Sequence, residues 1–357
     1  MSAHDENPPR RQTVVAPPIE GAVRMGPIMG LPRLLIEHGV DADATIRAHG
    51  CDPALFADAD NSLSFDMVGG LLARAAAVTG CPYPGLQVCQ PGGGEALGIV
   101  GRTARLAPDL GAALRCVVRS LHLHDRGAVP YLRADSDQAV FGYSFYSTGV
   151  MGTAHIYDTA LAIAYDLIRE LVGQDWRAFE VRHFRDPSDV VVPFRDLFAA
   201  RLRFGASQAA IVFPAADLKR PLASADQQRF RAALIDLASL DGRNGGSLAQ
   251  QVRRELLRLL AAGGGLEKHA CKRAALAAML RLHPRNLNRR LQSEGTTFAA
   301  ELARARYDIA RALLRDTRLQ IGDIAATLGY AETAPFARAF RCWSGTTASD
   351  WRDRQSR

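Results

Sequence analysis

The sequence predicts an α+β N-terminal domain followed by an all-α C-terminal domain that holds two helix-turn-helix units. A length of 357 residues is enough for two domains that each bury a core. Helical and strand-like patterns are mixed up to a cluster of Gly, Asn, Asp and Ser, and no segment beyond that cluster has the composition of a strand. Near the C-terminus one helical pattern occurs twice. We therefore place the domains at 23–238 and 248–357, with 239–247 as the linker.

Residues 1–22 are expected to form a disordered arm. They are not expected to be a signal peptide, because acidic residues and prolines interrupt the apolar run that a signal peptide needs. The most apolar helical stretch, 159–172, is broken by Asp166 and Arg169, so no segment reaches the roughly 20 apolar residues of a membrane span. Six cysteines without a Cys-x-x-Cys pair favour reduced thiols over disulfides or a zinc site. We expect a cytoplasmic protein with no membrane partner.

The front domain alternates between two kinds of periodicity. Amphipathic patterns predict helices at 31–56, 62–80, 109–124 and 152–172. Short aromatic and β-branched segments, separated by turn residues, predict strands at 129–135, 138–147, 178–184, 202–204 and 209–213. This mixture is typical of an α+β domain.

Charge is distributed unevenly along the chain. The net charge is +7, and residues 265–357 hold seventeen Lys and Arg against nine Asp and Glu, a net of +8. The first 264 residues therefore sum to −1 by difference. A near-neutral domain followed by a compact basic one indicates that the second domain meets a polyanion.

The internal repeat lies at 276–291 and 324–343. Each copy has an aliphatic residue, two alanines, a spacer and a leucine, then a short break and a second helix with an apolar residue two positions before Arg. The matched pairs are Leu276 with Ile324, Leu280 with Leu328, Leu287 with Phe336, and Arg289 with Arg338. Small alanines allow two helices to cross closely, which favours a helix-turn-helix in each copy.

The segment between the two copies, 297–316, has helical periodicity and no Gly or Pro. It predicts one continuous helix of about 25 to 30 Å at 1.5 Å per residue. Such a helix can hold the two units about one DNA turn, roughly 34 Å, apart.

The stretch "GDIAATLGYAETAPFARAFRCWSGTTASDWR", 322–352, resembles the motif of the AraC/XylS family of transcriptional regulators. The front region resembles the mixed α/β effector domain of regulators labelled arabinose-binding-like, through "LPRLL", "DWRAFEVRH" and "FRDLFAARLRFGASQAAIVFPAADLKRPL". It does not resemble the jelly-roll domain of the arabinose regulator itself, so the label gives no reason to expect arabinose.

The resemblance assigns DNA contacts to the outward faces of the two second helices. Base-contacting positions would be Arg285, Asn288, Arg289, Thr333, Ala334 and Arg338. Arg pairs with guanine, Asn with adenine, and Thr or Ala packs on a thymine methyl group. Phosphates would be contacted by Lys272, Arg290 and Arg341, where charge matters more than direction.

Three positions depart from the family pattern. Arg281 stands where the first turn usually has Gly, Gln320 replaces the usual Ser or Thr cap, and Ala348 replaces Pro. Pro335 in the second recognition helix is tolerated only if it lies in the first turn.

An effector pocket is predicted around the hairpin and the helix that follows it, at Tyr143, Phe145, Tyr146, His155 and Tyr157. Alternate strand positions are also compatible with plain core packing. His122 and His124 in "HLHD" are compatible with a metal, but on a helix they would face different ways and no carboxylate or Cys cluster has ligand spacing around them. We predict neither a metal nor a cofactor.

The resemblance implies a sequence-specific transcriptional regulator, an activator responding to a small organic effector. Its expected partners are double-stranded promoter DNA, that effector, RNA polymerase and a second copy of the chain. A front domain that only dimerises is one alternative, and an enzyme domain fused to a DNA-binding module is another. No catalytic motif is present in the sequence, so no catalytic residue and no enzymatic activity is predicted.

Overall fold

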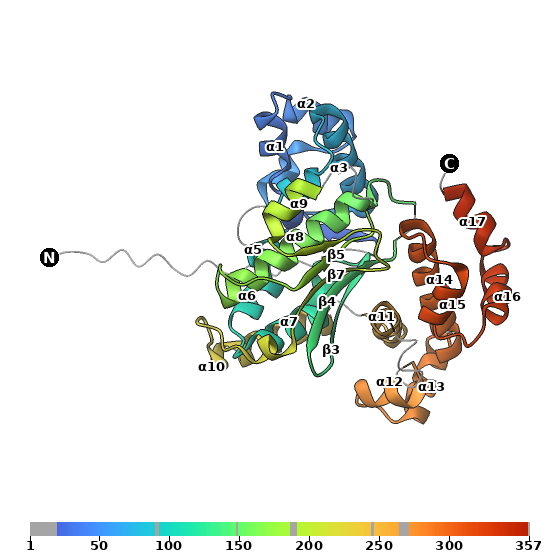
Figure 1. The fold of residues 1–357 in the computed structure, drawn as a ribbon. Helices are drawn as coiled ribbons and strands as arrows, with labels where there is room; N and C mark the ends of the chain where they lie inside the picture. Colours follow the sequence, from blue (N-terminus) through green and yellow to red (C-terminus); the bar gives the residue numbers. More distant parts are fainter. Residues whose placement is uncertain are drawn as a thin grey trace.

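The computed structural model describes residues 20–89, 93–147, 149–185, 191–243, 246–263 and 271–355. A front domain of helices around one main sheet lies beside a C-terminal helical domain (Figure 1). This arrangement confirms the predicted fold class, α+β followed by all-α. Of the predicted arm, residues 1–19 lie outside the described residues.

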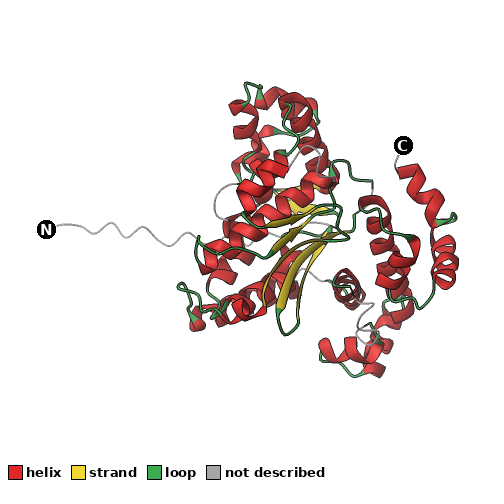
Figure 2. Ribbon diagram, viewed as in Figure 1, coloured by secondary structure: helices red, strands yellow, loops and turns green. Residues whose placement is uncertain are grey.

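The main sheet has five strands in the order β3-β4-β7-β5-β6 (Figure 2). Their bounds are β3 Ala128–Ala134, β4 Gln138–Phe145, β5 Glu180–Arg182, β6 Arg201–Arg203 and β7 Ala209–Pro214. Neighbouring strands are antiparallel except β5 and β6, which run parallel. Each of the five predicted strand segments is confirmed.

Both faces of this sheet are covered. Side chains alternate between the two faces along each strand, so neighbouring residues of one strand show what packs on each face. On β7, Ile211 and Phe213 belong to the main core together with residues of α8, Thr153–Val172. Ala210 and Val212 belong to a smaller cluster on the opposite face, where Ala261 packs against them. The C-terminal domain therefore completes the burial of the sheet.

The other front-domain elements surround α8 and the sheet. In chain order they are β1 Ala22–Arg24, η1 Gly26–Ile28, α1 Leu31–Glu37, α2 Ala42–Ala48, η2 Pro53–Ala57, β2 Ser62–Ser64, α3 Phe65–Thr79, α4 Pro84–Gln87, α5 Gly93–Ala96, α6 Ile99–Arg105, α7 Leu110–Ser120, η3 Leu121–Leu123, α9 Val191–Phe198, η4 Ala215–Lys219 and α10 Gln227–Arg243. The predicted helix at 31–56 is divided into α1, α2 and η2, with Gly39 and Gly50 in the left-handed region at the breaks.

The helix α10 extends five residues into the predicted linker. Asp241 near its end accepts a hydrogen bond from His122 at 2.8 Å and lies 3.7 Å from Arg254. These contacts anchor a segment whose composition alone suggests a linker. Positions 244 and 245 of that linker lie outside the described residues.

The C-terminal domain is helical throughout the part that the structure describes. Its helices are α11 Leu248–Ala261, α12 Arg273–Met279, α13 Pro284–Ser293, α14 Phe298–Asp316, α15 Ile321–Thr327, α16 Thr333–Ser344 and α17 Ala348–Gln355. The core includes Leu276 and Leu287 from the first repeat copy and Ile324 and Phe336 from the second, all without exposed surface. The repeat thus forms two helix-turn-helix units, α12 with α13 and α15 with α16.

The turns of the two units have the same backbone hydrogen bonds. The N–H of Leu282 donates to the carbonyl of Ala277 at 2.8 Å, and the N–H of Tyr330 donates to Ala325 at 3.0 Å. These bonds close a Schellman motif, which needs a left-handed residue after the helix. That residue is Arg281 in the first unit, with φ of 55°, and Gly329 in the second, with φ of 81°.

Because an L side chain is disfavoured in the left-handed region, Arg281→Gly is expected to raise the free energy of unfolding by about 0.5 to 1 kcal/mol. Gly329→Ala is the matched reverse change and is expected to lower it by about 1 kcal/mol. A Cβ at Gly329 would meet only the Arg306 guanidinium, at 3.6 Å, so the effect comes from the backbone. Urea denaturation measures both changes. A destabilised Arg281→Gly variant would contradict this account.

Candidate nucleic-acid interface and ligand cavity

The helix α13 has one buried stripe and one exposed stripe. His283 caps its N-terminus by accepting from the N–H of Arg285 at 3.2 Å, and Pro284 occupies the first helical position, where a missing N–H costs little. Leu287 and Leu291 are fully buried. Arg285 and Arg289 lie on the opposite side and are exposed, while Arg290, exposed, and Asn288, half-buried, flank the buried stripe.

The helix α16 repeats this division. Phe336 and Phe340 are fully buried, and Phe340 packs edge to face with Trp351 at 6.3 Å between ring centroids. The exposed positions include each residue singled out by the resemblance, namely Thr333, Ala334, Arg338 and Arg341. Pro335 is the third residue of the helix, so its missing N–H falls in the first turn. Lys272, at the start of α12, is also exposed.

The exposed arginines of α13 and α16 form no ion pair with any residue that the structure describes. They are Arg285, Arg289, Arg290, Arg338 and Arg341. Three arginines of α14 differ, since Arg304, Arg311 and Arg315 each pair with a carboxylate on the same helix. The positive charge of the two recognition helices is therefore available to a polyanion.

The helix α14 connects the two units, and its 19 residues correspond to about 28 Å at 1.5 Å per residue. Figure 1 shows α12 and α13 toward one end of the domain and α16 and α17 toward the other. Asp308 of α14 accepts from Arg253 of α11 and from Arg311, both at 2.6 Å. Tyr307 packs on Phe340, with ring centroids 5.7 Å apart. These contacts fix α14 within the domain.

The C-terminal end of α14 contacts the front domain. Asp316 accepts hydrogen bonds from Tyr157 and Thr153 of α8, both at 3.3 Å. Arg315 donates to the carbonyl of Ser147 at 2.7 Å and lies 5.4 Å from the ring centroid of Phe145. The predicted effector residues Phe145 and Tyr157 thus lie where the front domain meets the helix that joins the two units.

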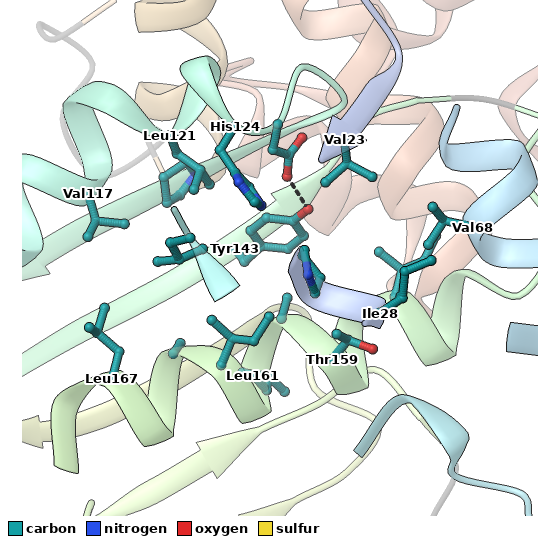
Figure 3. Close-up of a pocket in the computed structure, with 18 of the residues that line it drawn as sticks. Val23, Ile28, Val68, Val117, Leu121, His124, Tyr143, Thr159, Leu161 and Leu167 are labelled. Atoms are coloured by element: carbon teal, nitrogen blue, oxygen red, sulfur yellow. Dashed lines mark hydrogen bonds between the residues drawn. The ribbon is translucent and has the colours of Figure 1, made fainter. Parts of the chain in front are cut away.

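A cavity lies in the front domain between α8, α7 and the β3-β4 hairpin. Tyr143 is the residue of the predicted effector set that lines it (Figure 3). The Tyr143 hydroxyl donates to Asp125 at 2.5 Å, and Asp125 also accepts from the N–H groups of Gly127 and Ala128. Burial raises the pKa of Asp125 to about 6.

His124 is a lining residue that the effector prediction missed. It is 3% exposed, and burial followed by the nearby charge of Arg24 lowers its pKa to about 3. The sequence singled out "HLHD" only as a weak metal candidate. In the structure His122 bonds to Asp241, whereas His124 lines the cavity, so the two imidazoles do not share a site.

The remaining predicted effector residues lie away from this cavity. The Tyr146 hydroxyl is 3.4 Å from Glu20 and borders a second cavity that Arg253 and Arg254 of the C-terminal domain also line. His155 Nδ1 lies 2.8 Å from Arg185 Nη2.

Arg185 and His183 surround the fully buried Asp158. Arg185 donates two hydrogen bonds to this carboxylate, at 3.1 and 2.6 Å, and His183 Nε2 lies 2.9 Å from it. Burial alone would raise the pKa of Asp158, but hydrogen bonds from His155 and His183 and the charge of Arg185 hold it below its usual range. This cluster joins α8 to the end of β5.

Comparison with known families bears on the enzyme alternative. Residues 39–222 match the model described as the arabinose-binding domain of AraC transcription regulator, N-term, and residues 276–354 match a model of a helix-turn-helix domain. The chain belongs to the AraC family of transcriptional regulators. Its helix-turn-helix units make it a DNA-binding protein, and an AraC-family regulator is not an enzyme, which confirms that prediction.

Two relatives match along nearly the whole chain. The regulator VirS of Mycobacterium tuberculosis is 28% identical over 334 residues, 92% of this chain and 96% of VirS. The ornithine utilization regulator of Pseudomonas aeruginosa is 27% identical over 329 residues, 90% of this chain and 93% of that protein. The crystal structure of the regulator CdpR from Pseudomonas aeruginosa covers 76% of this chain and 86% of that chain, at 25% identity and a TM-score of 0.37.

Among the helices of the described ranges, none is long and apolar enough to span a bilayer.

Proposed function

We propose that this AraC-family protein activates transcription by binding two adjacent major-groove segments of promoter DNA and that a small organic effector in its front domain controls this binding. One observation supports the proposal above all. A single helix, α14, joins two recognition helices whose exposed arginines form no ion pair with a described residue, and its last turn hydrogen-bonds to the front domain.

In this proposal α13 and α16 each enter a major groove. Arg289 and Arg338 pair with guanine O6 and N7, and Asn288 pairs with adenine. Arg285 contacts a further base edge, and Thr333 and Ala334 pack on thymine methyl groups. The phosphate contacts are made by Lys272, Arg290 and Arg341, which fix the position of the units on the duplex.

The front domain transmits effector binding through α8 and the β4 strand. Tyr143, at the cavity, packs edge to face on Tyr157 at 6.2 Å between ring centroids, and Tyr157 donates to Asp316. An effector that favours one arrangement of these rings would shift the population of DNA-bound states. The active form is a cytoplasmic homodimer that contacts RNA polymerase.

We call the two DNA segments contacted by α13 and α16 of one chain the half-sites. Insertion of base pairs between these half-sites tests whether both units bind at the same time. Half-sites are first obtained by selecting duplexes from a random pool with the full chain. About five inserted base pairs turn one half-site to the opposite face of the DNA. We expect the affinity to fall about a hundredfold, because the second unit can no longer bind together with the first.

An insertion of about ten base pairs returns the second half-site to the original face of the DNA, but it leaves the two half-sites about one helical turn farther apart. Because α14 also fixes the distance between the two units, this longer insertion should not restore the affinity. Substitution of the intervening bases without insertion is the control and should have little effect. An affinity that is unchanged by the insertions would contradict simultaneous binding by both units.

A further inference from the structure

The polar side chains that line the front-domain cavity differ in whether they have hydrogen-bond partners within the protein. The Thr159 hydroxyl donates to two acceptors, the carbonyl of His155 on the same helix and the carbonyl of Gly85. Tyr143 donates to Asp125, and Asp125 also accepts from two backbone N–H groups. The bonds that these three groups make are all within the protein.

His124 is different, because neither ring nitrogen has a hydrogen-bond partner among the residues that the structure describes. Buried polar atoms in folded proteins are almost always hydrogen-bonded, so an unpaired imidazole at a cavity wall indicates a partner from outside the chain. Its lowered pKa keeps the ring neutral, with one N–H donor and one nitrogen acceptor. It can therefore bond to a hydroxyl or a carbonyl oxygen.

The rest of the cavity wall is aliphatic or aromatic. Val117 and Leu167 lie on one side of Figure 3 and Val68 on the other, with His124 and Tyr143 between them. Such a wall offers no partners for a molecule with a hydroxyl on nearly every carbon, as in a pentose, because each unpaired hydroxyl would lose its hydration. A negatively charged ligand would also be disfavoured, since Asp125 is ionised above a pH of about 6.

We infer that the effector is an uncharged, mainly hydrocarbon molecule whose single hydroxyl or carbonyl group hydrogen-bonds to His124. This inference rests on the proposed function only in treating the front domain as the effector-binding part. It departs from the arabinose in the description of the matching family model.

Direct binding to the full chain, without DNA, tests the inference. The probes are decanol, the methyl ketone of the same length, decanoate and arabinose, followed by calorimetry and by the thermal unfolding midpoint. Decanol and the ketone should bind saturably and raise the midpoint. Decanoate should bind at least about tenfold more weakly, because its carboxylate must be desolvated beside Asp125. Arabinose should not bind.

Two histidine variants separate the polar contact from general packing. His124→Phe removes the ring nitrogens and should weaken decanol and ketone binding about tenfold, the loss expected for one neutral hydrogen bond. His122→Phe, two residues away and directed at Asp241, should leave probe binding unchanged. Ala160→Phe fills the cavity from α8 and should abolish binding of both probes.

Several outcomes would overturn the inference. These are no saturable binding of the apolar probes to the wild-type chain, binding of arabinose, or equal weakening in His122→Phe and His124→Phe. Wild-type binding decides the question even if a variant fails to fold. Each of these outcomes would leave the half-site insertion experiment unaffected, so failure of the effector class and failure of the DNA-binding proposal are distinguishable.

Discussion

Alanine at Asn288 or Arg289 is expected to relax base preference at individual positions of the operator. Each lost bidentate pair should cost about 1 to 3 kcal/mol on the preferred sequence and much less on random DNA. Arg289 lies on the side of α13 opposite the buried Leu287 and Leu291, and Asn288 lies half-buried at the edge of that side, so neither change removes a side chain of the apolar core. Competition binding with every single-base variant of the selected duplex measures the effect.

Arg290→Ala provides the matched control on the same helix. Arg290 is exposed like Arg289 and has no ion-pair partner among the described residues. Loss of a phosphate contact should weaken all sequences alike and reduce the salt slope by about 1. If the three variants lose equal affinity on specific and random DNA, the division into base and phosphate contacts is wrong.

The largest expected effect on stability concerns Asp158. Asp158→Ala would leave Arg185 and His183 partly or fully buried without their carboxylate, and removing one member of a buried ion pair typically costs about 3 to 5 kcal/mol. Urea denaturation of the full chain is the measurement. Asp43→Ala removes the carboxylate of an exposed pair with Arg47 and should change stability by less than about 1 kcal/mol.

The pH dependence gives an independent check of the Asp158 cluster. Because the pKa of Asp158 is held below its usual value, its stabilising contribution is present above the unfolded pKa, roughly 4, and is lost as the pH falls below it. Asp158→Asn should flatten the acid side of the stability profile. A variant as stable as the wild type, with an unchanged acid limb, would show that the cluster contributes little.

Patterns local in the sequence predicted most of the C-terminal domain. The repeat fixed which side chains face inward, since Leu287 and Phe336 occupy equivalent buried positions. Two departures from the family pattern also have the expected result. Arg281, which replaces Gly, is a turn residue in the left-handed region, and the helix that follows Gln320 begins without a side-chain cap. Short-range periodicity is sufficient where each helix buries one stripe.

The effector cavity depends on contacts that no local pattern encodes. Tyr143 and Phe145 lie two positions apart on β4, yet Tyr143 lines the cavity while Phe145, like Tyr157 of α8, lies at the C-terminal domain. The sequence does not specify which part of β4 meets α8 and which part meets α14. The buried His124 follows a short 3-10 helix, η3, and its direction is set by the segment's return to the sheet.

The helix α11 limits how this protein can be recombined with its relatives. Leu248, Val252 and Leu256 fill the core of the helix-turn-helix domain, while Val129 of β3 belongs to the same apolar cluster. A chimaera that joins this DNA-binding domain to another front domain at the 239–247 boundary would keep α11 but replace the strand beneath it. Such hybrids should be soluble only where the donor sheet offers a small apolar side chain at the position of Val129.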